Sequence, residues 1–433
     1  MLFCPISVLF LSTLFPPSPS ASKSISSTIP SIEESPFMKV VISQDELLRG
    51  INAVLDVVPS KTALPVLSNL LFEASGGGLK VSATDLDISI VCELSATVEE
   101  GGATTVPARK FAEIVRELPH DAIVLIAEEG RVTLQRQIGG AGTYALMSVP
   151  ADDFPELPSN IEGPELGFEA NSDADGNGQA ALLKDMISKT AFAVSRDETR
   201  PVLNGVLWQI GDNRMTMVAT DGARLVKYSK TVTDSQSGGV STEAIVPTRA
   251  LNHLSKLMAS GSRLGRVQFG QNHLMFDLSS AKEEQGEGGG VRLFSRLVEG
   301  PYVDYEQVIP QGNEKQLKIA NSLLSPAVRR VSILSSSQTH QVRFLITPGE
   351  VELSATSQEI GGEARETLEA EYGEDEMAIG YNSTYLLDIL RRIDSDHVVF
   401  ELDSPVTAGI IRPSEQPEGE DYLCLLMPLR LND

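Results

Sequence analysis

The chain offers few residues whose type and spacing could do chemistry. Its five histidines show neither the HExxH spacing nor any other spacing of zinc ligands; they are His120, His253, His273, His340 and His397. A GxSxG nucleophile turn, a P-loop and a GxGxxG turn between a strand and a helix are also absent from the sequence. The residues therefore predict neither a catalytic centre nor a zinc site.

One acidic segment is similar to the start of a calcium loop. Asp173, Asp175, Asn177 and Gly178 have the spacing of an EF-hand, in which the twelfth position must be a bidentate glutamate. That position is Lys184, whose ammonium group would repel the ion. We therefore expect no metal ion and no cofactor.

The elements that position the side chains occur three times along the chain. Thr84, Thr220 and Thr356 are equally spaced, and each follows a run that alternates apolar and polar residues. Before each run lie a helical pattern and an extended apolar stretch, and after it a Val-Pro or Ile-Gly-Tyr-Asn segment opens a second helical pattern. Three similar units of this size predict a modular scaffold.

Each unit is predicted to be α+β, with two helices packed on antiparallel sheet. The period changes from helical to alternating and back in a fixed order. Pro107 suits the start of a helix, because its missing N–H would have no partner there. The predicted helices are 45–58, 107–118, 184–200, 248–256, 322–334 and 384–393.

Length agrees with this division, since 433 residues exceed the roughly 250–300 at which a single core stops growing. We place the boundaries so that residues 38–160, 161–312 and 313–433 form the first, second and third repeats. Residues 1–37 fall outside them and contain one basic residue, Lys23, too few for a secretory signal. This leader is interpreted as the product of a misassigned start before Met38, with a transit peptide or signal sequence as alternatives.

Composition is that of a globular protein in a reducing compartment. Hydrophobic residues make up 41% of the chain and charged residues 22%, and no run approaches the roughly 18 apolar residues of a membrane span. The three cysteines, Cys4, Cys92 and Cys424, are far apart and form no CxxC pair. A cytoplasmic protein without membrane contact is expected.

The distribution of charge is uneven. The chain has a net charge of −24, which argues against a broadly basic nucleic-acid binder, yet five of the six predicted helices are net positive. If the helices line one surface, that surface would touch phosphates weakly and without reading bases. The alternative is that these are ordinary solvated helix faces.

Five segments, in this order and inside the triplicated frame, resemble the bacterial DNA polymerase III beta subunit, the sliding clamp family. They are Thr-Val-Pro-Ala-Arg-Lys-Phe (105–111), Pro-Ala-Asp-Asp-Phe-Pro (150–155), Ala-Thr-Asp-Gly-Ala-Arg-Leu (219–225), Val-Asp-Tyr-Glu-Gln-Val-Ile-Pro (303–310) and the end of the chain (422–431). The resemblance covers the chain from Met38 to Leu431. It implies a head-to-tail homodimeric ring, a closed heterologous assembly, with helices around a central hole and sheets outside.

The resemblance also implies a non-catalytic processivity factor that encircles double-stranded DNA without reading its sequence. Its partners would be the replicative DNA polymerase catalytic subunit, the clamp loader and other proteins with a clamp-binding motif. The residues expected to touch DNA, some by analogy with the family and some from the repeat alone, are Lys61, Arg109, Lys110, Lys189, Arg196, Arg200, Arg249, Arg329 and Arg391.

In this family partners enter a hydrophobic groove between the second and third domains, where apolar walls bury peptide Leu or Phe side chains. Carried over by position, the groove residues are Arg200, Leu203, Thr220, Gly222, Arg224, Leu225, Val308, Thr407, Met427, Pro428, Leu429 and Arg430. For Leu203 and Leu225 plain domain core is the alternative. Ala223, Val303, Gln307 and Pro405 depart from the common family residues, which leaves the peptide preference open.

The dimer interface is carried over in the same way. Tyr144 and Leu146 of the first repeat are expected to pack against Ile333 and Leu334 of the third repeat of the other subunit, with intradomain core as the alternative. Two other functions remain: a peptide-binding scaffold that does not bind DNA, and an enzyme without a recognisable motif. The enzyme would need a histidine within hydrogen-bond reach of a carboxylate in a cleft.

Overall fold

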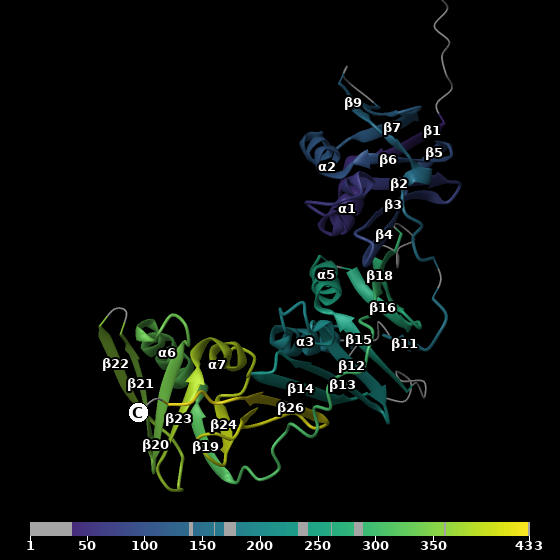
Figure 1. Cartoon of the computed structure of the whole chain (residues 1–433). Helices are drawn as coiled ribbons and strands as arrows, with labels where there is room; N and C mark the ends of the chain where they lie inside the picture. The colour runs from purple at the N-terminus through teal and green to yellow at the C-terminus, as the bar shows by residue number, and fades with distance from the viewer. Residues whose placement is uncertain are drawn as a thin grey trace, which may run out of the picture. The chain divides into compact units, whose positions relative to one another are not determined.

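The computed structural model describes residues 37–137, 142–159, 161–168, 179–232, 241–260, 262–280, 289–358 and 361–431. The leader up to residue 36 and the first part of the calcium-like segment lie outside these residues. The described elements repeat one α+β plan three times, which confirms the predicted fold class (Figure 1).

Among the described residues each repeat contributes two α-helices, and the two contact each other within every repeat. Ser43 shows how the first of them begins, because its hydroxyl accepts a hydrogen bond from the Glu46 N–H at 3.3 Å. Acidic residues fill the next turn, where the helix dipole favours them. The helices are α1 (Gln44–Val54), α2 (Ala108–Glu117), α3 (Gln179–Thr190), α5 (Thr248–Ala259), α6 (Asn321–Val331) and α7 (Ser383–Leu390).

Two of the antiparallel sheets belong to single repeats. The five-stranded sheet of the first repeat has the order β5 (Thr97–Glu100), β1 (Met38–Ser43), β7 (Ala122–Glu128), β8 (Arg131–Arg136), β9 (Thr143–Met147). The four-stranded sheet of the third repeat has the order β22 (Gly362–Glu369), β21 (Glu350–Ser357), β20 (Gln341–Thr347), β23 (Met377–Asn382).

The two larger antiparallel sheets each join two repeats. The nine-stranded sheet runs β10 (Val149–Pro150), β6 (Gly102–Pro107), β2 (Asn69–Ser75), β3 (Gly78–Thr84), β4 (Ile88–Leu94), β18 (Val291–Arg296), β17 (His273–Ser280), β16 (Ser262–Phe269), β11 (Glu165–Gly167). The eight-stranded sheet runs β15 (Thr242–Pro247), β12 (Gly205–Gly211), β13 (Arg214–Thr220), β14 (Arg224–Thr231), β26 (Glu420–Leu426), β25 (Gly409–Pro413), β24 (His397–Leu402), β19 (Lys315–Ala320).

Successive repeats are therefore joined by strand pairing. Strand β4 pairs with β18 at the first junction, where Ile90 lies opposite Leu293. Strand β14 pairs with β26 at the second junction, where Val226 lies opposite Cys424. The two junctions use corresponding strands, because β4 and β14 each follow a strand that ends at one of the repeated threonines.

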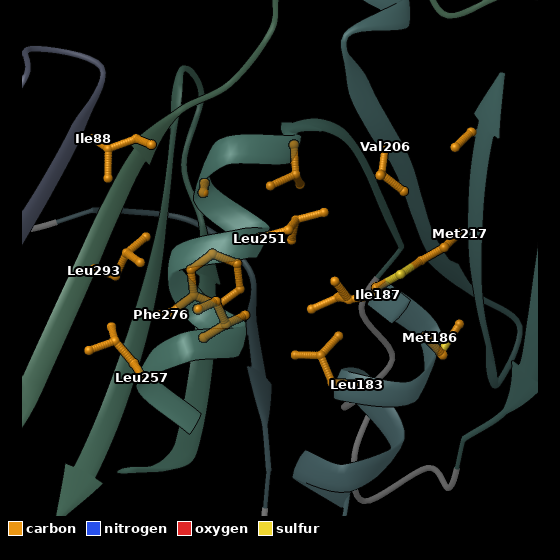
Figure 2. Packing of buried hydrophobic residues seen from close by; sticks show 14 of the residues in the cluster. Ile88, Leu183, Met186, Ile187, Val206, Met217, Leu251, Leu257, Phe276 and Leu293 are labelled. Carbon is orange, nitrogen blue, oxygen red and sulfur yellow. The ribbon is translucent and has the colours of Figure 1, made fainter. Parts of the chain in front are cut away.

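The main core lies between the helices and the sheets. Figure 2 shows α3, with Leu183, Met186 and Ile187, and α5, with Leu251 and Leu257, packing among side chains of the second repeat's strands. All five of these side chains are buried. The helices thus occupy one face of the sheets, and alternate strand residues remain on the other face.

The predicted helix at 184–200 is partly wrong. Its helix, α3, ends at Thr190 and is followed by a short 3-10 turn, η4 (Ala191–Ala193). Residues 194–200 then form a non-helical connection to a second short turn, η5 (Pro201–Leu203). Local apolar spacing does not distinguish a helix from such turns, which are held by tertiary hydrogen bonds including Ser195 N to Leu203 O at 2.8 Å.

Candidate functional site

A tight turn connects β13 to β14 and brings four predicted groove residues together: Thr220, Gly222, Arg224 and Leu225. The Thr220 hydroxyl donates to the Arg224 carbonyl at 2.7 Å and accepts from the Gly222 N–H at 3.1 Å. One carboxylate oxygen of Asp221 accepts from the N–H groups of Ala223 and Arg224 at 2.9 and 3.0 Å. Gly222 has φ 92°, a conformation that glycine adopts without strain.

A second, smaller hydrophobic cluster lies beside this turn, separate from the main core. Leu225, Leu423 and Leu425 belong to it, whereas Val226 and Cys424 belong to the main core. This alternation is that of a strand, so the cluster covers the face of the eight-stranded sheet opposite the helices. Tyr302, Tyr305 and Ile309 pack on it from the segment that follows the second repeat's last strand.

Exposed apolar side chains flank this cluster along the chain. Val308 precedes Ile309, Val406 precedes Ala408, and Met427 follows strand β26, and all three side chains are exposed. The Met427 N–H donates to the Ala223 carbonyl at 2.9 Å, so the chain end is attached to the turn. These three are therefore the exposed apolar side chains next to cluster residues in the chain, and such side chains could receive Leu or Phe side chains of a peptide.

Not every predicted groove residue faces this surface. Leu203 and Leu225 are buried, which agrees with the alternative that they are core. Leu429 turns toward β23, where its N–H donates to the Gly380 carbonyl at 2.7 Å, while Arg430 is exposed. Thr407 donates to the Asp403 carboxylate at 3.1 Å in the loop before β25, and Pro428 is half-buried.

The guanidinium of Arg224 points away from this surface into a cleft of about 1000 Å³ between α3, α5 and α7. Within it, the Nη1 group donates to Asp388 at 2.9 Å and the Nη2 group to the Phe192 carbonyl at 2.9 Å. Nε donates back to Asp221 at 3.1 Å. The prediction that Arg224 lines the groove is therefore wrong for its guanidinium, because the side chain is only 8% exposed and its charged end faces the cleft.

Sequence reasoning did not find the partners of Arg224 in this cleft. Phe192 and Tyr385 hold their rings 5.2 and 4.4 Å from the Arg224 guanidinium carbon, in cation–π contact. Asp388 could have been noticed, because it is the one acidic residue of the predicted helix 384–393. Its proximity to Arg224 could not, since the two residues are 164 positions apart.

Lys189 is not placed to contact DNA. Its ammonium lies 3.0 Å from Asp185 and 2.9 Å from Asp394, and it approaches the rings of Tyr228 and Tyr422. Burial by itself lowers the pKa of Lys189, but the hydrogen bonds to Asp394 and Asp185 outweigh it, and the pKa is raised. A lysine that is already paired and only 14% exposed is a structural cation, so Lys189 is removed from the predicted DNA contacts.

The other predicted DNA contacts differ in whether their side chains already have a hydrogen-bonded or ionic partner. Lys61, Arg196 and Arg329 have no hydrogen-bonded or ionic partner among the residues that the structure describes. The remaining cations each have a partner: Arg109 with the Val58 carbonyl, Lys110 with Glu113, Arg200 with Asp197, Arg249 with Asp85 and Arg391 with Asp388. Arg196, Arg200 and Arg249 line the same cleft as Arg224.

The four predicted interface residues lie near two strand edges. Tyr144 and Leu146 belong to β9, an edge strand of the five-stranded sheet, and Tyr144 is exposed. Ile333 and Leu334 form a short 3-10 turn, η7 (Ser332–Leu334), beside β22, an edge strand of the four-stranded sheet. Ile333 is 71% exposed, so within one chain it is not core.

The histidines and acidic groups do not form a cleft site in the described part of the chain. His120 lies 2.7 Å from Asp45, but both side chains are more than 70% exposed, on the open surface. Within the described ranges, no three His, Cys, Asp or Glu side chains are placed to hold a metal ion. None of the described helices is long and apolar enough to cross a membrane.

A triplicated α+β chain with a second hydrophobic cluster at its second junction and edge strands at the ends of the sheets in its outer repeats fits the class of clamp-type processivity proteins. Family profiles match all three repeats: the N-terminal (residues 38–158), central (179–304) and C-terminal (306–430) domains of the DNA polymerase III beta subunit. The chain belongs to this family, the beta sliding clamps.

Individual relatives agree with the family. The beta sliding clamp of Chlamydia muridarum is 32% identical over 396 residues, which is 92% of this chain and all of the relative. A crystal structure of the Caulobacter crescentus beta sliding clamp superposes with a TM-score of 0.80 at 30% identity. A DnaN sliding clamp from Bartonella birtlesii, bound to griselimycin, superposes with a TM-score of 0.79 at 31% identity. Both alignments cover 91% of this chain and all of the relative.

Proposed function

We propose that this chain is a DNA sliding clamp in which two copies close head to tail into a ring around duplex DNA. The ring tethers the replicative DNA polymerase catalytic subunit, the clamp loader and other proteins with a clamp-binding motif through an apolar surface that includes Val308, Val406 and Met427. Its role is mechanical and not enzymatic, and it acts in the cytoplasm. The boundary proposed at residue 160 falls between the matched N-terminal and central domains, whereas the one proposed at residue 312 lies inside the matched C-terminal domain, which begins at residue 306.

The observation that carries this proposal is the pair of open edges, β9 and β22. By its place in the repeat, β22 corresponds to β4 and β14, because each follows the strand that ends near a repeated threonine. Strand β9 corresponds to β18 and β26, because each is the last strand of its hairpin series. Each of the other four strands is paired across a junction, and an open edge is an aggregation hazard unless it is covered. A second copy supplies the matching edge.

The repeat also predicts the register of this third junction. Thr84, Thr220 and Thr356 lie opposite Ser89, Leu225 and Glu363, so the next residues, Ile90, Val226 and Ala364, correspond. The partner strands β18, β26 and β9 are aligned through the strand before each of them. There, Phe276 lies opposite Leu293, Ile411 opposite Cys424 and Leu134 opposite Tyr144, so we take Leu293, Cys424 and Tyr144 as corresponding residues. Since Ile90 pairs with Leu293 and Val226 with Cys424, Ala364 of one copy should lie opposite Tyr144 of the other.

The register is tested by cross-linking between copies. We expect Tyr144→Cys and Ala364→Cys, placed on separate chains and mixed, to form a disulfide-linked dimer under mild oxidation, because directly opposed residues bring their Cβ atoms to about 4.5–5.5 Å. Tyr144→Cys mixed with Glu369→Cys is the matched control and should stay unlinked. Equal cross-linking of both pairs, or of neither, would reject the register.

Ile333 tests the dimer itself. Replacement by aspartate leaves a solvated charge in a single chain but buries an unpaired charge in a ring. We expect Ile333→Asp to be monomeric in sedimentation velocity while keeping the wild-type circular dichroism spectrum. A variant that stays dimeric would show that Ile333 does not lie in the interface.

The helix faces supply contacts with DNA that are weak enough to permit sliding. The proposed contacts are Lys61, Arg109, Lys110, Arg196, Arg200, Arg249, Arg329 and Arg391. Most of these cations are already paired with the chain's own groups, so a phosphate competes with an existing partner and binding is weak and salt-dependent. A topological link does not need tight contacts.

Encirclement is tested by loading the protein onto nicked circular DNA with a clamp loader and washing in high salt. Salt removes phosphate contacts, whereas a closed ring leaves only over a free end. Retention on the circle and loss after linearisation are expected, and Ile333→Asp should be lost from both. Equal loss of wild-type protein from circle and linear DNA, with the loader active on a control clamp, would favour the peptide-binding scaffold instead.

A further inference from the structure

Arg224 lies on the turn beside the proposed groove, but the donors of its guanidinium are already hydrogen-bonded to other groups of the chain. Its Nε, Nη1 and Nη2 groups donate to Asp221, Asp388 and the Phe192 carbonyl at 3.1, 2.9 and 2.9 Å. Phe192 and Tyr385 cover the guanidinium in cation–π contact. A side chain held in this way is not available to bond a peptide on the far side of the sheet.

The first repeat shows that the turn does not need an arginine to form. Its turn from Thr84 to Ile88 has the same bonds: the Thr84 hydroxyl to the Ile88 carbonyl at 3.0 Å, and Asp85 to the N–H groups of Asp87 and Ile88 at 3.1 and 2.8 Å. Ile88 occupies the place of Arg224 and is buried. The contribution of Arg224 is therefore the link to Asp388 of α7, in the third repeat.

The same turn, between Thr220 and Arg224, also positions residues of the proposed peptide surface. The Ala223 carbonyl accepts the Met427 N–H at 2.9 Å, and Leu225, directly after Arg224, is part of the cluster beneath the surface. A shift of the turn relative to α7 would displace Leu225 and, through the hydrogen bond from its N–H, Met427, and contacts that must match a peptide tolerate little displacement.

We propose that Arg224 is a positioning residue for the peptide groove, which acts by fixing the turn between Thr220 and Arg224 to Asp388 on α7. This inference rests on the proposed function, since it assigns a role within the proposed groove. It implies that Asp388, which faces the cleft and does not touch the peptide surface, controls peptide affinity.

The test uses the full-length protein and griselimycin as the probe, with affinity measured by titration calorimetry. Asp388→Asn keeps the shape of the side chain and removes the charge that holds Nη1. We expect it to weaken binding about tenfold, or about 1.4 kcal/mol. Arg224→Lys should weaken binding similarly, because an ammonium cannot make three divergent bonds. The double variant should bind no more weakly than the worse single variant, since both changes break one link.

Three controls make the outcome decisive. Glu371→Gln removes an acid that pairs with Lys318 elsewhere in the third repeat and should leave binding unchanged. Asp388→Glu keeps the charge and should recover part of the affinity. Met427→Lys alters the peptide surface itself and should abolish binding. Thermal unfolding of each variant checks that it is folded, and Asp388→Ser, which also removes the charge, replaces Asp388→Asn if the latter is not.

The possible results are distinguishable. If Arg224→Lys weakens binding and Asp388→Asn does not, Arg224 contacts the ligand directly and the inference is wrong. If neither variant weakens binding while Met427→Lys abolishes it, the inference is wrong and the proposed groove stands. If wild-type protein does not bind griselimycin, or Met427→Lys binds normally, the groove itself is misplaced.

Discussion

The turns that end β3 and β13 share their backbone hydrogen bonds but reach the next repeat in opposite ways. At the first junction the turn supplies the acid: Asp85 accepts from Arg249 of α5. At the second junction the turn supplies the cation: Arg224 donates to Asp388 of α7. Arg249 is 63% exposed and Asp85 9%, whereas Arg224 is 8% exposed and Asp388 30%, so the arginine is the solvated partner at the first junction and the buried partner at the second.

This difference shows that the repeated fold determines where an ion pair links two repeats, but not how much that pair contributes to stability. An exposed ion pair contributes about 0–1 kcal/mol, because water solvates the charges equally well. Breaking a buried pair by removing one partner costs about 3–5 kcal/mol, because the other charge is left without a partner. The second junction, which carries the peptide surface, is thus the more strongly linked of the two.

A second buried cation makes the same contrast larger. At the second junction Lys189 of α3 pairs with Asp394 of the third repeat, and Tyr228 of β14 donates to Glu420, the first residue of β26, at 2.8 Å. Burial raises the pKa of Glu420, but hydrogen bonds from Lys230 and Tyr228 outweigh it and hold the pKa below its usual range. The corresponding links at the first junction, such as Lys256 to Asp56, are exposed.

The largest expected effect is that of Arg224→Ala. It leaves Asp221 without its cation and Asp388 with only the more distant Arg391, 3.7 Å away, and it removes two ring contacts, so we expect the free energy of unfolding to fall by about 3 kcal/mol. The midpoint of urea unfolding at fixed protein concentration measures this. A loss below about 1 kcal/mol would mean that the second junction is no more strongly tied than the first.

Lys189→Met should have an intermediate effect. The methionine keeps the packing of the aliphatic chain, but Asp185 and Asp394 lose their shared ammonium. Because Asp394 is 78% exposed, water replaces part of the interaction, and the expected loss is about 1–2 kcal/mol. The same urea measurement applies, and DNA retention should be unchanged. A drop in retention with unchanged stability would restore Lys189 as a DNA contact.

Arg249→Gln should change stability by less than about 1 kcal/mol, because it breaks an exposed pair at the first junction. The comparison with Arg224→Ala is direct, since each removes the arginine that bonds a homologous turn. If Arg249 also contacts phosphates, the variant lowers DNA binding at low salt and its salt dependence. A stability loss as large as that of Arg224→Ala would remove the contrast between the junctions.

The smallest effect concerns His253, on α5 at the first junction. Burial, with the positive charges of Lys256 and Arg249, lowers the pKa of His253, while Asp56 and Asp85 act in the opposite sense. The unfolded chain therefore binds a proton more readily, at the ordinary pKa of about 6.5. Stability that is fully present above this pH is lost as the pH falls through it.

The variant His253→Gln checks this pH dependence. Its urea midpoint should fall less than that of the wild-type protein between pH 8 and pH 5, with the two curves diverging below about pH 6.5. Parallel curves would show that His253 does not titrate differently in the folded protein.

Sequence patterns predicted the repeats, the α+β class and most elements because they depend on local periodicity. Pro107, the residue before α2, and the alternation at Ala122–Ile126 mark elements whose apolar faces are spaced at the helix and strand periods. The segment after Thr190 was misassigned as helix, because its conformation depends on hydrogen bonds such as that from the Ser195 N–H to the Leu203 carbonyl in η5, which apolar spacing does not reveal. The groove residues on the turn were also predicted, but by resemblance and only by position.

The sequence by itself determined the triplicated scaffold, since three copies of one pattern of apolar spacing can bury their faces in only one repeated way. It also placed Thr220, Gly222 and Leu225 on one turn. Only the tertiary structure decided what the charged side chains do. Arg224 faces a cleft and Lys189 is a buried bridge, because their partners, Asp388 and Asp394, come from the following repeat. Whether a cation is free for a phosphate or taken by a carboxylate depends on groups brought together by folding, which spacing along the chain does not encode.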